Sequence, residues 1–394
     1  MTTNITYPLA TSSWDNEEVE AINEVIASGR YTMGKRVEQF ENEFAEYFGS
    51  KYAVMVNSGS TANLLMIALL KWRHNLTRFK DANIIVPAVG WSTTYFPITQ
   101  NGFKINFVDV DPETYNIDVD KIEQAINPGT VAIMPVNLCG NPSDFTRIKE
   151  ICAKRRLLLL EDNCESMGGK WEDRHLGTLG FAGSHSFFFS HHLQTMEGGM
   201  ICTPNLDDMY WLKSLRAHGW CRDLPEKFEL YNKSGSFFKD SFTFVTPGYS
   251  VRPLEMSGAI GSVQLKKWPT LLEERIKNKE YFIELFEEAP WIRIQKEKHG
   301  ISTWFSFGCV LQGALEGRRD EVIKAFDQNS IEVRPLASGN FLTQPVTKLL
   351  PHISHNNYTG AEDIDKNGFW VGNHSSDCKA GIFKMFTILK LLAE

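Results

Sequence analysis

Two adjacent histidines, His191 and His192, follow an apolar run in the stretch SFFFSHHLQTMEGG, residues 186–199. Imidazole has an unperturbed pKa of about 6.5, so a histidine here could act as a general base or acid near neutral pH. The alternative is that both rings are only polar tips on an apolar surface. Taken alone, the stretch supports the two interpretations equally.

A turn of small residues, NSGSTAN at positions 57–63, separates the apolar run YAVMV from an apolar segment with helical character. The N-terminus of a helix presents unpaired backbone N–H groups and the positive end of a dipole, which together can bind a phosphate. Serine and threonine are also preferred as ordinary helix caps. The turn therefore predicts either a phosphate site or a local cap.

A carboxylate stands at the end of another apolar run, LLLLED at 157–162. Ligands of open α/β sheets bind at the carboxyl ends of the strands. Asp162 could pair there with the pyridinium nitrogen of a pyridoxal cofactor, or it could be a helix cap. Trp91, just past the strand in VPAVGWSTT, could stack on a planar ring or belong to the core.

Lysine is absent where a pyridoxal enzyme needs it. Such an enzyme should carry a lysine soon after the strand SFFFS, to bind the aldehyde of the cofactor covalently. The chain contains no lysine between Lys170 and Lys213, and His191 occupies the expected place. A pyridoxal site in this chain would have to hold its cofactor without a covalent bond.

Short buried runs alternate with amphipathic helical segments through the first two thirds of the chain. This alternation predicts an α/β domain built around a mostly parallel sheet. The predicted strands are 52–56, 83–87, 105–110, 131–136, 157–162, 185–190 and 199–203.

The pattern changes after about residue 255. A long charged helix is predicted over 266–290, followed by strands at 291–295 and 302–312 and a helix at 318–330. We therefore expect a smaller α+β domain over 256–394.

Composition excludes several classes of protein. The 394 residues are 42% hydrophobic and 23% charged, as in an ordinary globular protein, and the net charge of −7 argues against nucleic acid or an anionic membrane as the main partner. The seven cysteines are scattered without a C-x-x-C, so neither a metal site nor an iron–sulfur cluster is expected. No signal peptide or long apolar span is recognisable, which predicts a cytoplasmic protein.

These motifs together resemble the sugar aminotransferase/dehydratase family that uses pyridoxal 5′-phosphate (PLP) on the aspartate-aminotransferase fold. The resemblance extends through nearly the whole chain in order and spacing. Its components are NSGSTAN, VPAVGWSTT, EDNCES, the strand with TMEGG, LRAHGW (215–220), PGYSVRPLEMSGAIG (247–261) and IEVRP (331–335). The implied fold is PLP-dependent transferase fold type I, with a large PLP-binding domain over 1–255 and a small domain over 256–394. The N-terminal segment is expected to pack with the small domain.

The resemblance also implies roles for particular residues. Most members carry lysine where this chain has His191, which would be the catalytic base; His192 is expected to be structural. Expected substrate contacts come from His218, Arg222, Arg252 and Arg334. Ser250 replaces an asparagine that reaches a cofactor phosphate across a dimer interface in the family, which puts that contact in question. The expected cofactor contacts are Ser58, Gly59, Ser60, Trp91, Asp162, Glu165, Ser186 and Ser250.

The variant with histidine resembles the 3-dehydratase branch of the family. It implies removal of the C3 hydroxyl from a nucleotide-linked 4-keto-6-deoxyhexose, with GDP-4-keto-6-deoxy-D-mannose as the expected substrate. L-glutamate would convert non-covalently bound PLP to pyridoxamine phosphate (PMP), and ammonia would be released. The expected assembly is a homodimer with sites at its interface, and the expected pathway is deoxysugar (colitose) synthesis for O-antigen lipopolysaccharide. The alternatives are a nucleotide-sugar 4-aminotransferase and a non-catalytic protein of the same fold.

Overall fold

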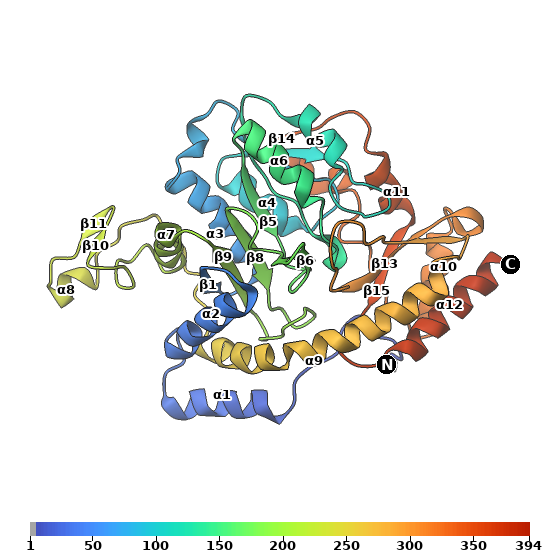
Figure 1. Ribbon diagram of the computed structural model, residues 1–394, viewed down its shortest axis with the longest axis horizontal. Helices are drawn as coiled ribbons and strands as arrows, with labels where there is room; N and C mark the ends of the chain where they lie inside the picture. Colours follow the sequence, from blue (N-terminus) through green and yellow to red (C-terminus); the bar gives the residue numbers. More distant parts are fainter. Residues whose placement is uncertain (1–4) are drawn as a thin grey trace.

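An eight-stranded sheet forms the centre of the protein in the computed structural model, which describes residues 5–394 (Figure 1). Its strand order is β1-β9-β8-β5-β4-β2-β3-β14. All neighbours are parallel except β9, which runs antiparallel to both β1 and β8. The predicted mixed, mostly parallel sheet is confirmed. Its strands are β1 (Tyr52–Val56), β2 (Asn83–Pro87), β3 (Lys104–Val108), β4 (Thr130–Ile133), β5 (Leu158–Asp162), β8 (Ala182–Ser186), β9 (Gly199–Thr203) and β14 (His352–Ile353).

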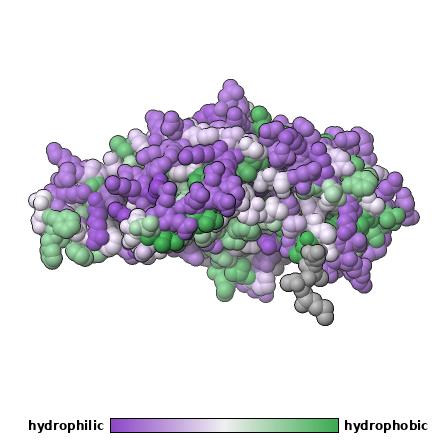
Figure 2. Space-filling view, turned by 90° about the horizontal axis from the view of Figure 1, so that it is seen from below, coloured by the Kyte–Doolittle hydropathy of each residue, from purple (hydrophilic) through white to green (hydrophobic). Residues whose placement is uncertain are grey.

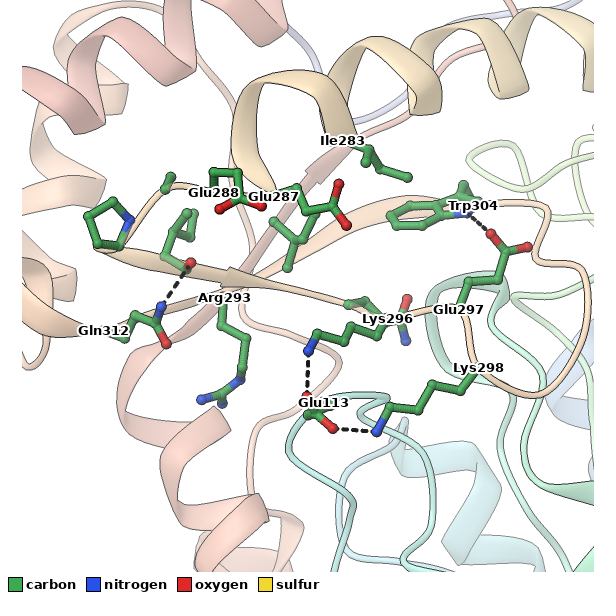
Figure 3. Close-up of a pocket in the computed structure, with 15 residues that line it drawn as sticks. Glu113, Ile283, Glu287, Glu288, Arg293, Lys296, Glu297, Lys298, Trp304 and Gln312 are labelled. Atoms are coloured by element: carbon green, nitrogen blue, oxygen red, sulfur yellow. Dashed lines mark hydrogen bonds and ion pairs between the residues drawn. The ribbon is translucent and has the colours of Figure 1, made fainter.

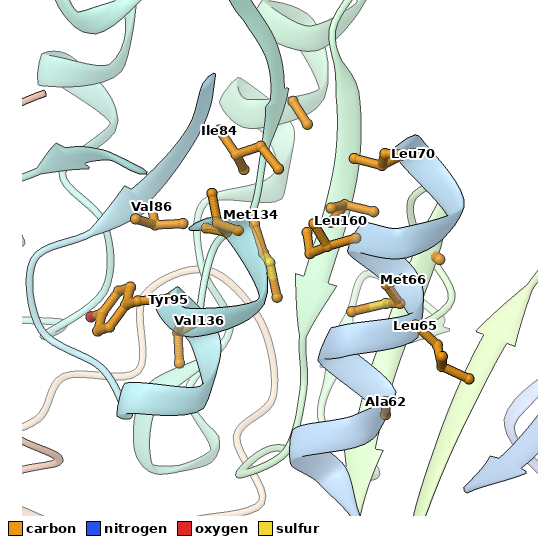
Figure 4. Close-up of a cluster of buried hydrophobic side chains, with 14 of the residues drawn as sticks. Ala62, Leu65, Met66, Leu70, Ile84, Val86, Tyr95, Met134, Val136 and Leu160 are labelled. Atoms are coloured by element: carbon orange, nitrogen blue, oxygen red, sulfur yellow. The ribbon is translucent and has the colours of Figure 1, made fainter. Parts of the chain in front are cut away.

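Helices cover both faces of this sheet. Successive side chains of a strand point to opposite faces, and in β2 Ile84 and Val86 join one hydrophobic cluster while Ile85 joins another. The first cluster contains residues of α3, α4 and α7 and is shown in Figure 4, and the second contains residues of α5 and α6. Burial on both faces explains why the strands are continuous apolar runs. These helices are α3 (Gly59–Trp72), α4 (Ser92–Gln100), α5 (Val119–Ala125), α6 (Phe145–Arg155) and α7 (Leu206–Arg216).

A second, three-stranded antiparallel sheet lies in the C-terminal part of the chain, in the order β12-β13-β15. It shares a separate hydrophobic cluster with the C-terminal half of α9 and with α10 and α12. Tyr7 belongs to the same cluster, and its hydroxyl donates to the carbonyl oxygen of Gly372 at 2.7 Å. The elements of this part are β12 (Ile292–Ile294), β13 (Ser306–Leu311), α10 (Arg319–Gln328), α11 (Thr359–Asn367), β15 (Gly368–Gly372) and α12 (Lys379–Ala393).

Helix α9 (Glu255–Phe286) connects the two parts (Figure 1). Its N-terminal half packs against α1 (Asn16–Ser28) and α2 (Lys35–Phe48). The predicted helix over 266–290 was wrong at its start, which lies at Glu255. The reason is tertiary: a Cβ on Gly261 would lie 2.5 Å from the ring of Phe40, so a small residue that is a poor helix former is needed for close packing. The domain boundary at 255 stays a prediction.

The strand predicted over 185–190 was also placed wrongly, because β8 covers Ala182–Ser186. Its five residues are small or polar and all are buried, with Ser184 donating to the Asn63 side chain at 2.7 Å. Pairing with β9 ends at Ser186, and Phe187 enters a different cluster beside α2 and α9. The aromatic run after β8 therefore forms a loop, and His191 lies in that loop.

An arm of residues 223–247 projects beyond α7 at the left of Figure 1. It contains β10 (Lys227–Phe228), β11 (Tyr231–Asn232) and the short helix α8 (Phe237–Asp240). Hydrophobic side chains are visible at this end of the molecule in Figure 2, and the exposed aromatic residues of the arm are Phe237, Phe238, Phe242 and Phe244. A small hairpin elsewhere is formed by β6 (Lys170–Trp171) and β7 (Arg174–His175).

In the described part of the chain, every helix falls short of what crossing a membrane requires in length and apolar character. All seven cysteines are free thiols. Among residues 5–394, no three side chains of histidine, cysteine, aspartate or glutamate gather where they could hold a metal ion.

Candidate active site

A cavity of about 310 Å³ opens at the carboxyl ends of β1, β2, β4, β5 and β8. This is the edge of a parallel sheet at which ligands bind in α/β proteins. The C-terminal part of the chain closes the cavity from the other side. The lining residues are Ser58, Gly59, Ser60, Asn63, Trp91, Thr93, Thr94, Val136, Asp162, Cys164, Glu165, Ser186, Phe188, Ser190, His191, Glu197, Phe305, Arg334 and Trp370.

The N-terminus of α3 forms one wall. Ser58 is the N-cap, and its hydroxyl accepts from the N–H of Thr61 at 3.2 Å, while Ser60 donates to Thr93 at 3.0 Å. A Cβ on Gly59 would lie 2.6 Å from the Cβ of Ser186, so only glycine allows the helix to approach β8 this closely. The turn is thus a local cap that also exposes backbone N–H groups to the cavity, an arrangement that fits a phosphate.

Asp162, at the end of β5, is held in one orientation. One carboxylate oxygen, Oδ2, accepts from the Asn63 amide at 2.9 Å and the Thr94 hydroxyl at 2.7 Å. The other, Oδ1, accepts from the N–H of Cys164 at 3.2 Å. A carboxylate fixed in this way at the floor of a cavity fits the pyridinium nitrogen of a pyridoxal cofactor, and Trp91, 57% exposed at the start of α4, fits a residue that stacks on a ring.

Glu165 lies beside Asp162, and the N–H of Cys139 donates to its carboxylate at 2.9 Å. Burial raises the pKa of Glu165 to about 7, and the charge of Asp162 adds to this shift. Glu165 can therefore hold a proton at neutral pH and donate it to an acceptor in the cavity.

His191 lies on the loop after β8, and its backbone N–H donates to the carbonyl oxygen of Phe188 at 2.8 Å. Its ring contacts the ring of Phe305, with centroids 5.1 Å apart. Nδ1 is buried and has no hydrogen-bond partner among the described residues, which leaves Nε2 as the nitrogen that can meet a molecule in the cavity. Burial, with the charge of Arg275, lowers the pKa of His191 to about 4. His191 is thus a neutral imidazole at neutral pH, the form that can accept a proton, and a weaker base than an ordinary histidine.

His192 points elsewhere. It is buried against Trp268 and Phe305, at 5.5 Å and 5.4 Å between ring centroids, and does not line the cavity.

Four predicted site residues lie outside the cavity of their own chain. They gather around Trp220, with His218 at 4.6 Å between ring centroids and the guanidinium carbons of Arg222 and Arg252 at 3.8 Å and 5.5 Å from the Trp220 ring. Ser250 pairs with the backbone of Ala217 in the same region. Since the chain turns away into the arm at this point, a single chain does not bring these four residues to the cavity.

The other nine predicted site residues all line the cavity: Ser58, Gly59, Ser60, Trp91, Asp162, Glu165, Ser186, His191 and Arg334. Sequence reasoning missed several others. Asn63 had a recognisable signal, since it is a lone amide in the apolar helix NLLMIALL. Phe305 and Trp370 had none, because Phe305 lies just before β13 and Trp370 lies in β15, and both reach the cavity only through packing between the two parts.

A different, larger cavity of about 680 Å³ lies beside the C-terminal end of α9 (Figure 3). Several of its charged groups are paired: Lys296 and Lys298 both donate to Glu113, and Glu297 pairs with Lys279 and accepts from Trp304. It has neither a helix N-terminus nor an unpaired carboxylate at a strand end, so we do not assign the active site to it.

The lining of the active-site cavity contains no lysine among the described residues, although it contains a turn that fits a phosphate and a fixed carboxylate. This combination separates the site from that of an ordinary pyridoxal transferase, in which a lysine binds the cofactor.

The chain is similar over nearly its full length to proteins of known name and structure. GDP-4-keto-6-deoxy-D-mannose 3-dehydratase of Yersinia pseudotuberculosis is 49% identical over 388 residues, which are 98% of this chain and 98% of that protein. Two solved structures of GDP-4-keto-6-deoxymannose-3-dehydratase each superpose with a TM-score of 0.94 and 47% identity, covering 98% of this chain and 100% of theirs. One is a variant with bound GDP-perosamine, and the other holds a trapped PLP–glutamate geminal diamine.

The family model of the DegT/DnrJ/EryC1/StrS aminotransferases matches residues 12–384. The match includes every residue that lines the active-site cavity. The chain therefore belongs to the DegT/DnrJ/EryC1/StrS aminotransferase family.

Proposed function

We propose that this protein removes the C3 hydroxyl of GDP-4-keto-6-deoxy-D-mannose, using L-glutamate and a non-covalently bound pyridoxal cofactor. The overall reaction converts the sugar and glutamate to the 3-deoxy sugar, 2-oxoglutarate and ammonia, so that glutamate supplies the two electrons. Relatives at 47–49% identity over almost the full chain carry the corresponding dehydratase name, which supports this substrate. The 3-deoxy-4-keto sugar would serve the synthesis of colitose for a surface lipopolysaccharide.

One observation carries the proposal. His191 lines the cavity at the position where most members of the family have a lysine. No lysine from elsewhere in the described chain lines the cavity in its place. A lysine would recapture the aldehyde cofactor and favour transfer of its amine to the sugar. A histidine cannot form that bond, which leaves proton transfer as its contribution.

The cofactor would be held by residues of α3, β5 and β8 and by Trp91 at the start of α4. Ser60, the N–H groups at the start of α3 and Ser186 would bind its phosphate, Trp91 would cover its ring, and Asp162 would pair with its ring nitrogen. When bound, PMP supplies an amine that condenses with the keto group and a ring that accepts electrons. Glu165, whose pKa is raised to about 7, can hold a proton near neutral pH and would donate it to an oxygen at the edge of the ring.

His191 would perform the proton transfers. It would accept a proton at Nε2 and return it to the departing C3 oxygen, acting first as base and then as acid. Arg334 lines the same cavity and would contact the carboxylate of glutamate or an oxygen of the sugar nucleotide.

Product analysis tests the proposal. The purified protein is incubated with PLP, L-glutamate and GDP-4-keto-6-deoxymannose, the sugar is examined by mass spectrometry, and ammonia is assayed. We expect loss of one oxygen from the sugar with release of an equal amount of ammonia, and neither with the His191→Asn variant. A 4-amino sugar as the product would indicate an aminotransferase, and bound cofactor without turnover would indicate a non-catalytic protein.

We further propose that the protein is a homodimer, in which Arg222, Ser250 and Arg252 of one copy complete the cavity of the other. Two features support this: these residues gather around Trp220 outside their own cavity, and the neighbouring arm exposes four phenylalanines, with Phe237 at 89%. Contiguous exposed apolar side chains of this kind favour a protein interface.

Complementation tests the shared site. His191→Asn and Arg252→Ala, each inactive alone, are mixed under conditions that exchange subunits. The mixture should regain activity, because the mixed dimer has one site with neither substitution. Equal inactivity before and after exchange, in dimers shown to be mixed by mass spectrometry, would contradict the proposal.

We also propose a division of the chain into two domains and a location in the cytoplasm. Separate hydrophobic clusters for the two sheets support a large domain over 1–255 and a small one over 256–394. Seven free thiols support a reducing compartment, the cytoplasm, where nucleotide sugars are made.

A further inference from the structure

A buried cation, Arg275 of α9, lies behind His191. The residue is 5% exposed, and its Nη1 donates to the carbonyl oxygens of Phe305 at 3.2 Å and Asn373 at 2.7 Å. Nε is buried without a hydrogen-bond partner, and no carboxylate among residues 5–394 forms an ion pair with this guanidinium. Buried charges in proteins are normally paired, so an unpaired one needs a reason.

Arg275 is connected to His191 through Phe305. The guanidinium binds the backbone of Phe305, and the ring of Phe305 contacts the rings of both His191 and His192, at 5.1 Å and 5.4 Å between centroids. Phe305 also contacts Trp370 at 5.2 Å. The wall that supports the imidazole of His191 is therefore anchored by Arg275.

Other charged groups face His191 from the cavity side. Asp162 and Glu165 come from the end of β5, Glu197 from the turn before β9, and Arg334 from the second part of the chain. None of them forms a hydrogen bond or ion pair with His191. Besides burial, the charge that disfavours protonation of His191 is that of Arg275, which also acts on His192 and His374.

We propose that Arg275 is a positioning residue, which holds His191 against the cavity as a neutral base through the backbone of Phe305 and through its own unpaired charge. The use of that base in catalysis rests on the proposed function, whereas the effect on the imidazole does not. The same charge makes the protonated imidazole a stronger acid than an ordinary imidazolium, so that a proton taken up by His191 is readily passed to a departing oxygen. A carboxylate paired with the Arg275 guanidinium would cancel the influence of its charge on His191, both on the neutral base and on the protonated ring.

Titration of His191 in the protein without substrate tests the inference. Histidines are labelled with ¹³C at Cε1, and the His191 signal is assigned by its absence from His191→Asn. In the wild type, it should titrate well below the usual range of histidine. In Arg275→Gln, the midpoint should rise by about one pH unit, because a like charge has been removed. Arg275→Lys, which retains the charge, should restore most of the wild-type value.

Lys277→Gln is the matched control. It removes a positive charge from the same helix two residues away, where Lys277 pairs with Glu273 and Glu274 at the surface, and it should leave His191 unchanged. In the full reaction, the acid limb of the pH profile of kcat should move with the titration in Arg275→Gln and stay in place in Lys277→Gln.

Three results would overturn the inference. These are a wild-type His191 that titrates near 6.5, an Arg275→Gln midpoint equal to the wild type, and a loss of fold in both Arg275→Gln and Arg275→Met while Arg275→Lys folds. The last result would show that the charge of Arg275 serves folding rather than the ionisation of His191. Because the titration needs no turnover, wild-type protein that titrates as expected but does not deoxygenate the sugar would refute the proposed function alone.

Discussion

At the scale of single residues, the choice between histidine and lysine at position 191 decides the chemistry. Replacing His191 by lysine restores an amine to a cavity that otherwise fits a pyridoxal cofactor. We expect PLP to become covalently attached, which reduction with borohydride and mass spectrometry of the peptide would detect. Deoxygenation should fall by roughly 10² to 10⁴-fold, the usual contribution of a general base, and a 4-amino sugar should appear.

The His191→Asn variant separates the two consequences of this substitution. It removes the base without adding an amine, so it should lose deoxygenation and form neither the covalent adduct nor the 4-amino sugar. A lysine variant that deoxygenates as fast as the wild type would show that another group removes the proton.

At the scale of elements, the contact between α2 and α9 holds the loop that carries His191. Phe40 and Phe44 of α2 and Trp268 of α9 share a cluster with Phe187, the first residue of that loop. Gly261 allows the contact, since a Cβ there would lie 2.5 Å from the Phe40 ring. Gly261→Val should lower the free energy of unfolding by about 1–3 kcal/mol through overpacking.

Unfolding in urea, followed by circular dichroism, measures this effect. Lys266→Ala, at an exposed position of the same helix, is the control and should change stability by less than about 0.5 kcal/mol. If Gly261→Val proves as stable as this control, the close approach of the two helices is not needed.

At the scale of the whole molecule, buried and half-buried histidines make stability depend on pH. Burial lowers the pKa of His185 to about 3 and of His191 and His374 to about 4, and it also lowers the pKa of His175 and His192. Between about pH 6.5 and pH 4, the unfolded chain therefore binds protons that the folded protein does not, and stability falls as the pH falls.

Two carboxyls oppose this trend. Glu161 and Glu165 have pKa values raised to about 7 by burial, so their stabilising effect is present below about pH 4.5 and is lost as the pH rises through 7. Five histidines outweigh two carboxyls. The free energy of unfolding should fall from pH 7 to pH 5, by up to about 1.4 kcal/mol per pH unit for each net proton. Urea unfolding across this range measures it, and stability that is level or rises toward pH 5 would contradict the prediction.

The sequence by itself determined the layers of the fold and the floor of the site. Buried strands are covered on both faces, so each appears as an apolar run, and the residues after β1, β2 and β5 converge because parallel strands end at one edge. The positions of Ser58, Trp91 and Asp162 just after apolar runs were therefore enough to predict that they lie together. Their neighbour His191 was recognised from a missing lysine rather than from its surroundings.

Only the tertiary structure decided what surrounds that base. Phe305, just before β13, contacts His191, and it is itself contacted by Trp370 of β15 and Arg275 of α9. These positions depend on packing between segments that lie far apart in the sequence. It also decided where β8 ends and where α9 begins, because close contacts overrode local preference at both places. Sequence patterns report which groups can do chemistry, whereas burial and the field of neighbouring charges, which set how those groups ionise, exist only in the folded chain.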